Sequence, residues 1–430
     1  MRVHLLSCFV IAACSRAGSG GAGADDAGTT KPGDDGGGNG GDGGGGGSDS
    51  GGGGVCATGL GPWTGHDNVA PSADPPCGLM PSQVPQLVAI GFDDNAYSGL
   101  PGTNGTGGVT WATDMIRTRR NSDGSPIHLT FYLTTIYADT WESESQTFVK
   151  RAWRTALVDG HEIGDHTRTH SHGEAFTLAQ WDDEIQQCID MITKPFDPNE
   201  VNFTPDNTKG IGVAASDIIG FRTPFLEYND ATLQSEKAHG FHYDCSIEDG
   251  YQEDQDGTNY LWPYTLDHGS PGHEVLVGWG SKQPITPHAG LWEMPVHPVI
   301  VPPDNKCAMY GVPSGLRDRL KARQSWFDTD SGKITGFDYN LWVSFSMTKA
   351  EFLATMKYTL DQRIAGNRAP MMFGAHTDIY SSKYTAATGA TVAERQQAIE
   401  EFLDYARAKP MVRIRPNKEI LQWVRNPDPL

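Results

Sequence analysis

The sequence predicts an α/β fold, and within that class a (β/α) barrel. Beyond residue 80, short apolar runs rich in β-branched and aromatic residues alternate with longer amphipathic runs, which is the pattern of strands joined by crossover helices. The alternation continues to the end of a 430-residue chain that is 37% hydrophobic and holds 11 Trp, 14 Tyr and 16 Phe. A chain of this size can bury the large core of a barrel, although a doubly wound open sheet is the alternative.

Individual elements follow from local patterns. Strands are expected where short β-leaning runs occur, at residues 86–92, 127–134, 241–244 and 370–375. Three helices begin at a capping box, in which a Thr and a Gln or Glu three residues later satisfy free backbone N–H groups. The three pairs are Thr177 with Gln180, Thr348 with Glu351, and Thr391 with Glu394. Helices are therefore expected at residues 178–192, 349–364 and 392–408.

The first residues predict export. Arg2 supplies a positive charge, residues 5–13 are apolar, and small residues lead up to Cys14, as in a secretory signal. The run is too short to span a bilayer. It resembles a bacterial lipoprotein signal, residues 1–13, whose removal leaves Cys14 as the lipidated first residue; an ordinary secretory signal is the alternative. Ser15 after Cys14 indicates sorting to the outer membrane of a two-membrane bacterium.

A tether is expected after the signal. Residues 15–54 are almost entirely Gly, Ala, Asp, Ser and Thr and contain no aromatic residue, so they cannot recover the entropy of becoming ordered. A flexible coil of about 40 residues has an r.m.s. reach of roughly 35 Å. We therefore expect a lipidated Cys and linker at residues 14–54, a Pro-rich segment at 55–85, and one folded domain at 86–430.

Composition sets two further expectations. The chain has 33 Lys and Arg against 53 Asp and Glu, a formal net charge of -20, which repels phosphate backbones and disfavours nucleic acid as a partner. An exported chain can keep disulfides. Of the cysteines beyond Cys14, Cys56 with Cys77 is the first expected pair and Cys245 with Cys307 the second, which leaves Cys188 free.

Polar residues follow several strand-like runs, and in a barrel the carboxyl ends of the strands meet at one rim. These residues are Asp93 and Asp94 in "AIGFDDN", His166 and His170 in "EIGDHTRTH", Arg222 in "GFRTPF", and His376 in "MMFGAH". Four segments that are far apart in the chain are thus expected to deliver polar groups to one place.

The spacing of His166 and His170 favours a metal site. Two imidazoles and one carboxylate make an open Zn²⁺ site, and the Asp pair can supply the third ligand while its other member acts as a base. The alternative is a hydrogen-bonded polar loop, with Asp93 and Asp94 as a turn or helix cap. A zinc protease is disfavoured, because Thr167 stands where the Glu of His-Glu-x-x-His would be.

Five segments taken together resemble one known family. "GFDDN", "GHEIGDHTRTH", "GFRTPF", "FHYDCS" and "MMFGAHTDIY" occur in the order found in the polysaccharide deacetylases of carbohydrate esterase family 4, the NodB-homology domain, and are similar to its chitin-deacetylase-like branch. The resemblance implies a distorted (β/α)7 barrel. It also implies that Asp93 is the general base and that Asp94, His166 and His170 hold the metal.

The resemblance also implies roles for four further residues, but the sequence departs from the family pattern near some of them. Arg222 would orient Asp93, the backbone N–H of Phe225 would stabilise the oxyanion, His376 would protonate the leaving amine, and Asp244 would orient His376. Phe225 replaces the more usual Tyr, no Trp follows Asp244, and "MMFGAH" lacks the usual Leu-rich run. His297, in "EMPVHPV", is therefore the rival for the acid, although we interpret it as a structural histidine.

Other residues have simpler interpretations. His161 is expected in the core and His172 on the rim. The tryptophans of the long stretch 250–346 are expected mostly in the core, with one or two exposed as platforms for sugar rings. They are Trp262, Trp279, Trp292, Trp326 and Trp342.

The resemblance implies hydrolysis of the N-acetyl groups of a chitin-like or peptidoglycan polymer, with release of acetate. Zn²⁺ is the expected metal, with Co²⁺, Ni²⁺ or Mn²⁺ as alternatives. An acetylated polysaccharide is the expected partner, the lipid anchor the only expected membrane contact, and a monomer the expected state. Two other functions stay open: an O-acetyl xylan esterase with the same site, and an inactive carbohydrate-binding lipoprotein.

Overall fold

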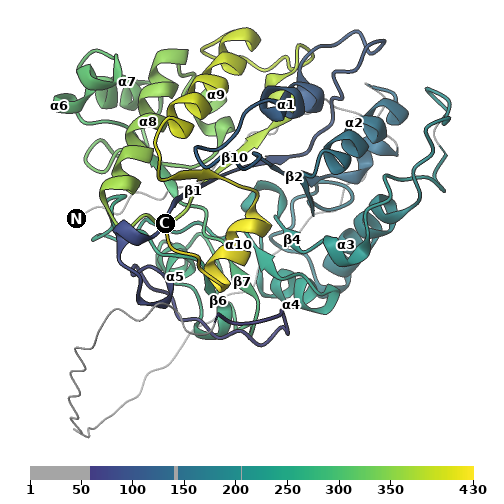
Figure 1. Cartoon of the computed structure of the whole chain (residues 1–430), viewed down its shortest axis with the longest axis horizontal. Coiled ribbons are helices and arrows are strands. Elements are labelled where there is room, and N and C mark those ends of the chain that lie inside the picture. The colour runs from purple at the N-terminus through teal and green to yellow at the C-terminus, as the bar shows by residue number, and fades with distance from the viewer. Residues whose placement is uncertain (1–58, 140–143, 205) are drawn as a thin grey trace, which may run out of the picture.

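The computed structural model describes residues 59–139, 144–204 and 206–430 (Figure 1). The expected signal at residues 1–13, the tether at 14–54 and Cys56 lie outside these residues, so they stay predictions. In the described part of the chain no helix is both long enough and apolar enough to cross a bilayer.

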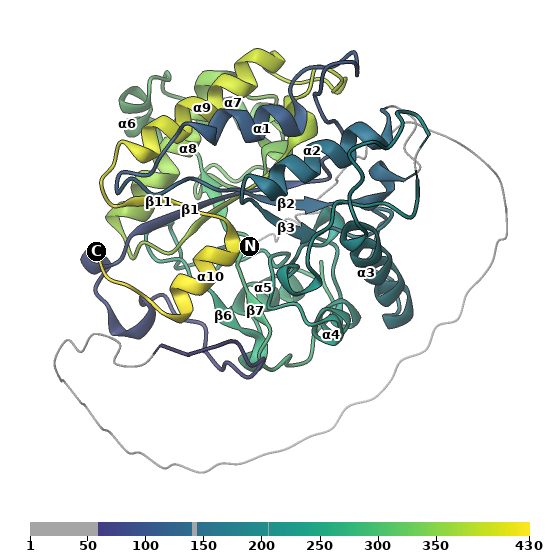
Figure 2. The same cartoon turned by 45° about the vertical axis from the view of Figure 1, so that its right-hand side comes forward.

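One curled sheet forms the centre of the molecule (Figures 1 and 2). Its strand order is β10-β1-β2-β3-β4-β5-β7-β6, and all neighbours on this path are parallel except β6 and β7. A further strand, β11, pairs with the first residues of β1. The strands are β1 (Gln86–Asp93), β2 (Thr130–Leu133), β3 (Glu162–Asp165), β4 (Gly220–Phe221), β5 (Tyr243–Asp244), β6 (Tyr264–Thr265), β7 (Trp292–Glu293), β10 (Met371–His376) and β11 (Val412–Ile414).

A second, two-stranded sheet continues the curve. β8 (Pro298–Ile300) follows β7 directly in the chain and pairs with β9 (Lys333–Thr335). The chain then passes Phe337, which forms a single parallel bridge to Gly374 of β10. This single bridge joins the segment after β9 to β10, so the curled sheet is not closed by a full ladder of hydrogen bonds. The predicted distorted (β/α) barrel is confirmed, and the alternative, a doubly wound open sheet, is wrong.

Helices pack on the outside of the sheet, as Figures 1 and 2 show. The main apolar core lies between strand side chains such as Ile90 and Phe131 and helix side chains such as Trp153, Trp181 and Phe402. The helices are α1 (Gly108–Arg117), α2 (Gln146–Val158), α3 (Leu178–Thr193), α4 (Asp230–His239), α5 (Pro271–Gly278), α6 (Asp304–Cys307), α7 (Leu316–Arg323), α8 (Lys349–Ala365), α9 (Val392–Arg407) and α10 (Asn417–Arg425).

The three predicted capping boxes are confirmed. In each, the Thr side chain accepts a hydrogen bond from the backbone N–H three residues later, and the Gln or Glu side chain accepts from the Thr backbone N–H. They begin α3, α8 and α9, whose bounds lie within one residue of the expected ranges. Hydrogen bonds within four residues therefore define these helix starts.

The N-terminus of α10 closes the barrel at the end where the strands begin. The backbone N–H of Asn417 donates to Thr130 Oγ1, and that of Lys418 donates to Glu162 Oε2, both at 2.9 Å. A buried carboxylate at a helix N-terminus accepts the free N–H groups of the first turn and complements the helix dipole. The opposite rim, where the strands end, is left for the site.

The segment before β1 packs against the same end of the barrel, where the strands begin. Asp67 accepts hydrogen bonds from Arg425 and from Trp292 Nε1, and the Trp63 ring stacks on His242 at 4.1 Å. Leu60 N–H donates to the carbonyl of Arg425. The described part of the Pro-rich segment is thus tied to the barrel by buried polar contacts.

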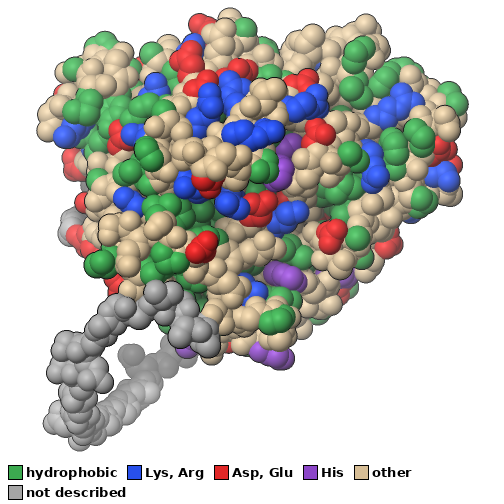
Figure 3. Space-filling view, in the orientation of Figure 1, with side chains coloured by type: hydrophobic (Ala, Val, Ile, Leu, Met, Phe, Trp, Pro, Cys, Tyr) green, Lys and Arg blue, Asp and Glu red, His purple; other side chains and the backbone are tan. Residues whose placement is uncertain are grey.

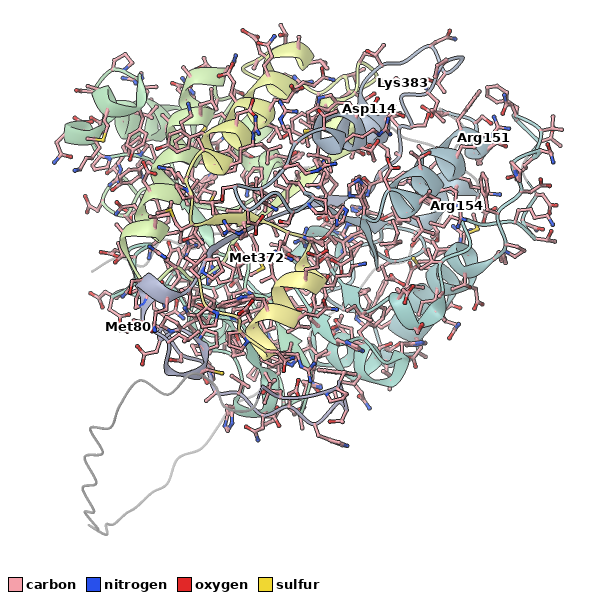
Figure 4. The ribbon with its side chains drawn as sticks, in the orientation of Figure 1. Met80, Asp114, Arg151, Arg154, Met372 and Lys383 are labelled. Atoms are coloured by element: carbon pink, nitrogen blue, oxygen red, sulfur yellow. The ribbon has the colours of Figure 1, made fainter. Side chains whose placement is uncertain are left out.

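An excursion of the chain after α3 runs back along α2. Arg151 and Arg154, labelled on α2 in Figure 4, donate to the carbonyls of Glu200 and Ile211, each at 2.9 Å. Lys150 forms a buried ion pair with Glu200 at 2.8 Å. On the face in Figure 3, basic and acidic side chains are interspersed, so that face carries no patch of a single sign.

Candidate metal centre and active site

The rim holds the polar groups that the sequence predicts there. β1 ends at Asp93, directly across from His376, the last residue of β10. Asp94 follows β1, His166 follows β3, and Arg222 follows β4. Because neighbouring parallel strands end at the same height, these side chains are brought within reach of one another.

Asp94, His166 and His170 bring one ligand atom each to a common point. Nε2 of His170 lies 3.0 Å from Asp94 Oδ1, and Nε2 of His166 lies 3.7 Å from it. The three ligand atoms all lie within 4.8 Å of one another. This donor set, two imidazoles from the loop after β3 and one carboxylate from the loop after β1, fits a divalent metal ion with open positions for water and substrate.

Local structure fixes the orientation of these three residues. Asp94 and His170 have left-handed backbones, with φ of 65° and 56°, and the N–H of His170 donates to Thr167 Oγ1. Nδ1 of His166 donates to the carbonyl of Arg222 at 2.7 Å. That hydrogen bond leaves the Nε2 lone pair of His166 facing Asp94, as metal-binding histidines require.

The protonation states of Asp94 and His166 suit a cation. Burial, with His170 close by, lowers the pKa of His166 to about 4, so this imidazole is neutral at pH 7. Burial would raise the pKa of Asp94, but His170, His376 and His166 outweigh it and hold that pKa well below the usual range. A carboxylate and a neutral imidazole are the forms that bind metal. Burial would lower the pKa of His170, but Asp94 raises it, so a metal ion would displace a proton from that imidazole.

Asp93 makes a separate, buried pair with Arg222. Nη1 of Arg222 donates to Asp93 Oδ1 at 2.8 Å, and its Nε donates to the carbonyl of Cys245 at 3.1 Å. The guanidinium lies against the Tyr132 and Phe337 rings, 4.5 and 5.2 Å from their centroids. Arg222 therefore fixes the orientation of Asp93 beside the donor set, as the resemblance implies.

His376 is oriented by Asp338. Nδ1 of His376 lies 2.7 Å from Asp338 Oδ1, and its backbone N–H donates to Asp338 Oδ2 at 2.9 Å. Burial would lower the pKa of His376, but Asp338, together with Asp94 and Asp93, raises it to about 10. A protonated imidazole beside Asp93 is placed to donate a proton.

The predicted role of Asp244 in orienting His376 is wrong. Tyr243 and Cys245, the neighbours of Asp244, both point into the barrel, where each contacts Tyr132. Because alternate residues of a strand face opposite sides, Asp244 points to the outer layer, where it accepts hydrogen bonds from Ser246.

Phe225 lies beside the donor set. Its backbone is left-handed, with φ 57° and ψ 10°. Its ring centroid is 4.5 Å from that of His170 and 4.1 Å from that of His172, on which it stacks. The predicted role of the Phe225 N–H stays a prediction.

The remaining histidines lie where their simpler interpretations put them. His161 is buried and accepts a hydrogen bond from the Leu129 N–H, while His172 is exposed on the rim and pairs with Glu227. His297 is buried and stacked on Tyr260 at 4.8 Å. Burial lowers the pKa of His297 well below its usual value, so it is a poor candidate for the acid.

Of the five tryptophans in the long stretch, three are fully in the core: Trp262, Trp292 and Trp342. Trp279 is half-buried and Trp326 is 36% exposed.

The second expected disulfide is wrong. Cys245 and Cys307 are both free and buried, and they belong to different core clusters. Cys188 is also free, as expected. The pairing of Cys77 with Cys56 stays a prediction, because Cys56 lies outside the described residues.

Sequence reasoning missed two carboxylates of the site. Asp338, in "GFDYN", lies on no predicted strand and reaches the rim only through the bridge between Phe337 and Gly374. Asp378, two residues after His376, accepts hydrogen bonds from the N–H groups of Ala96 and Tyr97. Burial, with Asp94 nearby, raises the pKa of Asp378 to about 8. Proximity to His376 in the chain was the available signal for Asp378.

Comparisons with known proteins agree with this geometry. Residues 84–243 match the model of a family described as polysaccharide deacetylase. A search of curated proteins gave no match.

Three solved structures share similarity with the chain. A Mycobacterium smegmatis protein named as a polysaccharide deacetylase is 17% identical, with 83% of this chain and 95% of that chain covered and a TM-score of 0.46. A family 4 carbohydrate esterase from Streptomyces lividans, in complex with acetate, is 18% identical (38% and 63% covered, TM-score 0.25). A family 4 acetyl xylan esterase from Clostridium thermocellum, in complex with a cobalt ion, is 19% identical (35% and 54% covered, TM-score 0.22). All three TM-scores lie below 0.5, so the family assignment depends on the family model.

Proposed function

The chain belongs to the polysaccharide deacetylase family, and from that premise we propose that it is a metal-dependent hydrolase of N-acetyl groups on a polymer of N-acetylglucosamine. The observation that carries the proposal is the Asp93–Arg222 pair beside the donor set of Asp94, His166 and His170. A protein that only binds sugar has no need of an oriented carboxylate beside its metal, whereas hydrolysis requires one as a base.

The residues support a hydrolytic sequence. A divalent ion held by Asp94, His166 and His170 would act as a Lewis acid, lowering the pKa of water and polarising the acetyl carbonyl. Asp93 accepts a proton from the attacking water. The Phe225 N–H donates to the oxygen on which negative charge develops, an interaction whose loss costs about a hundredfold or more in comparable sites.

His376 completes the reaction. Collapse of the tetrahedral species breaks the carbon–nitrogen bond, and the imidazolium of His376 gives its proton to the departing nitrogen. Asp338 keeps this imidazole protonated and correctly turned. The products are acetate and a free amino sugar.

The nature of the polymer is the finer part of the proposal. Chitin-like chains and peptidoglycan both carry the N-acetyl group that His376 is suited to release, because an amine is a poor leaving group without a proton donor. Release of acetate from acetylated xylan alone would instead identify an esterase with the same site.

Location follows from the N-terminal pattern. We propose that the chain is exported and lipid-anchored at Cys14, in the outer membrane of a two-membrane bacterium, and acts as a monomer on a polymer that cannot enter the cell. Mass spectrometry of the purified native protein would detect the added mass of a lipid on Cys14.

The substitution Asp93→Asn tests the mechanism. It should abolish acetate release while Zn²⁺ and oligosaccharide binding stay within a few-fold of the wild type, because Asn keeps the shape of Asp but cannot take a proton. An exposed control on α1, Asp114→Asn, should leave turnover unchanged; Asp114 is labelled in Figure 4. Equal turnover by Asp93→Asn and the wild type would refute the mechanism.

A further inference from the structure

The turn that follows His376 lies between the metal-binding part of the site and the carboxylate that orients His376. This 3-10 turn, Thr377–Tyr380, is the first structure after β10 and is buried apart from the half-buried Asp378. Its side chains reach in two directions. One set contacts the loop that carries Asp94, and the other contacts Asp338.

The first set ties the turn to the loop after β1. Asp378 Oδ1 accepts from the N–H groups of Ala96 at 2.9 Å and Tyr97 at 3.2 Å. Thr377 Oγ1 donates to Asn95 Oδ1 at 3.1 Å. The three residues directly after Asp94 are thus held by two side chains of one turn. Since Asp94 has a left-handed backbone, its position depends on how its loop is held.

The second set ties the turn to the carboxylate that orients His376. The Tyr380 hydroxyl oxygen accepts from Trp342 Nε1 at 3.2 Å, and the hydroxyl lies near Asp338; burial, together with Asp338, raises the pKa of Tyr380. The Trp342 N–H occupies an acceptor position of the Tyr380 oxygen, so the O–H proton stays available to donate toward Asp338. The ring of Tyr380 is held in place by Trp111, stacked at 4.6 Å.

The chain beyond the turn is held as well. Lys383, labelled near α1 in Figure 4, forms an ion pair with the buried Glu144 at 2.9 Å. Glu144 in turn accepts from the Ser98 N–H at 2.9 Å, so this contact leads back to the loop after β1.

We propose that the turn Thr377–Tyr380 sets the position of the acid relative to the metal centre, with Asp378 holding the metal-bearing loop and Tyr380 holding Asp338 and, through it, His376. Asp378 and Tyr380 are positioning residues, and neither takes part in bond making. The effect of Tyr380 on His376, called the acid arm below, rests on the proposed deacetylase function. The effect of Asp378 on metal binding, called the metal arm, does not, because it can be measured without turnover.

The metal arm is tested by Zn²⁺ affinity in competition with a chromophoric chelator. Asp378→Ala should weaken Zn²⁺ binding about tenfold or more, which is typical for groups that orient metal ligands. Asp378→Asn keeps the accepting oxygen and should stay within about threefold of the wild type. Wild-type affinity in the Ala variant, or equal weakening in Ala and Asn, would overturn the metal arm.

The acid arm is tested with two substrates. An aryl acetate releases a good leaving group and needs no acid, whereas an N-acetyl oligosaccharide does. Tyr380→Phe should lower kcat on the oligosaccharide about tenfold with KM unchanged, keep aryl acetate hydrolysis within twofold, and keep Zn²⁺ affinity. Tyr405→Phe, the same chemical change at a hydroxyl that donates to Asp361 at 2.6 Å, is the control and should change neither.

Equal losses on both substrates, or no loss on either, would overturn the acid arm. If the wild type releases no acetate, the proposed function fails first. The Nδ1–H resonance of His376 then still tests the inference by NMR, since Tyr380→Phe should shift it and Tyr405→Phe should not. An unshifted resonance in Tyr380→Phe would again overturn the acid arm.

Discussion

Replacing Asp338 by Asn should make the deacetylation rate fall as the pH rises. Burial would lower the pKa of His376, but nearby carboxylates, Asp338 foremost, raise it to about 10. A histidine with this pKa stays protonated throughout the range from pH 6 to pH 8. Asn carries no charge and can accept only one of the two hydrogen bonds that Asp338 accepts from His376.

The magnitude follows from the titration of an ordinary imidazole. At the unperturbed pKa of about 6.5, His is roughly three quarters protonated at pH 6 and about 3% protonated at pH 8. The variant should therefore lose little beyond the effect of misorientation at pH 6, and roughly thirtyfold more at pH 8. In the variant, burial still lowers the pKa of His376 while Asp94 and Asp93 still raise it, so about thirtyfold is the expectation where these effects balance.

The assay is kcat/KM for acetate release from an N-acetylglucosamine oligomer between pH 6 and 8, for the wild type, Asp338→Asn and Asp244→Asn. Asp244→Asn should keep the wild-type shape of the profile, because Asp244 faces the outer layer. A loss in Asp338→Asn that is the same at every pH would refute the assignment of Asp338. A pH-dependent loss in Asp244→Asn would restore the role that the sequence suggested.

Four further predictions concern stability and metal binding. Arg222→Ala leaves Asp93 buried without its partner and should lower the free energy of unfolding by about 3–5 kcal/mol, measured with urea; a loss below about 1 kcal/mol would contradict the buried pair. Zn²⁺ at about 100 times its Kd should stabilise the wild type by about 2.7 kcal/mol, and His170→Ala should lose this gain in a thermal melt. In the metal-free chain, the raised pKa of His376 stabilises the fold fully below pH 6.5, and that contribution disappears as the pH rises through about 10; urea stabilities of wild type and His376→Gln should converge over that range. Cys245 should react with a thiol reagent only after unfolding, and rapid reaction in the native state would mean that it is not buried.

The sequence predicts much of the site because strand ends gather at one rim. β1 and β10 are long apolar runs, so the polar residues that end them could be assigned to a common edge. His166 and His170 could be assigned to a metal site because their imidazole nitrogens are good metal ligands. Helix starts were predicted because capping boxes act within four residues.

What the sequence could not predict depends on short strands and on contacts between distant segments. β5 has two residues, too few for an alternation that would tell which side Asp244 faces. Asp338 belongs to a stretch that joins the barrel through one bridge, and no local pattern marks such a contact. The pairing of Cys245 with Cys307 failed for a similar reason, because it assumed a proximity that only the packing decides.

The most direct test of the proposed hydrolase is acetate release by the purified full-length chain, stripped of metal with a chelator and then restored with Zn²⁺. N-acetylglucosamine oligomers, peptidoglycan and acetylated xylan would be assayed in parallel. The account predicts release from an amino-sugar polymer that is lost on stripping and regained with Zn²⁺. No release from any of the three, by a chain that still binds Zn²⁺ and sugar, would contradict it.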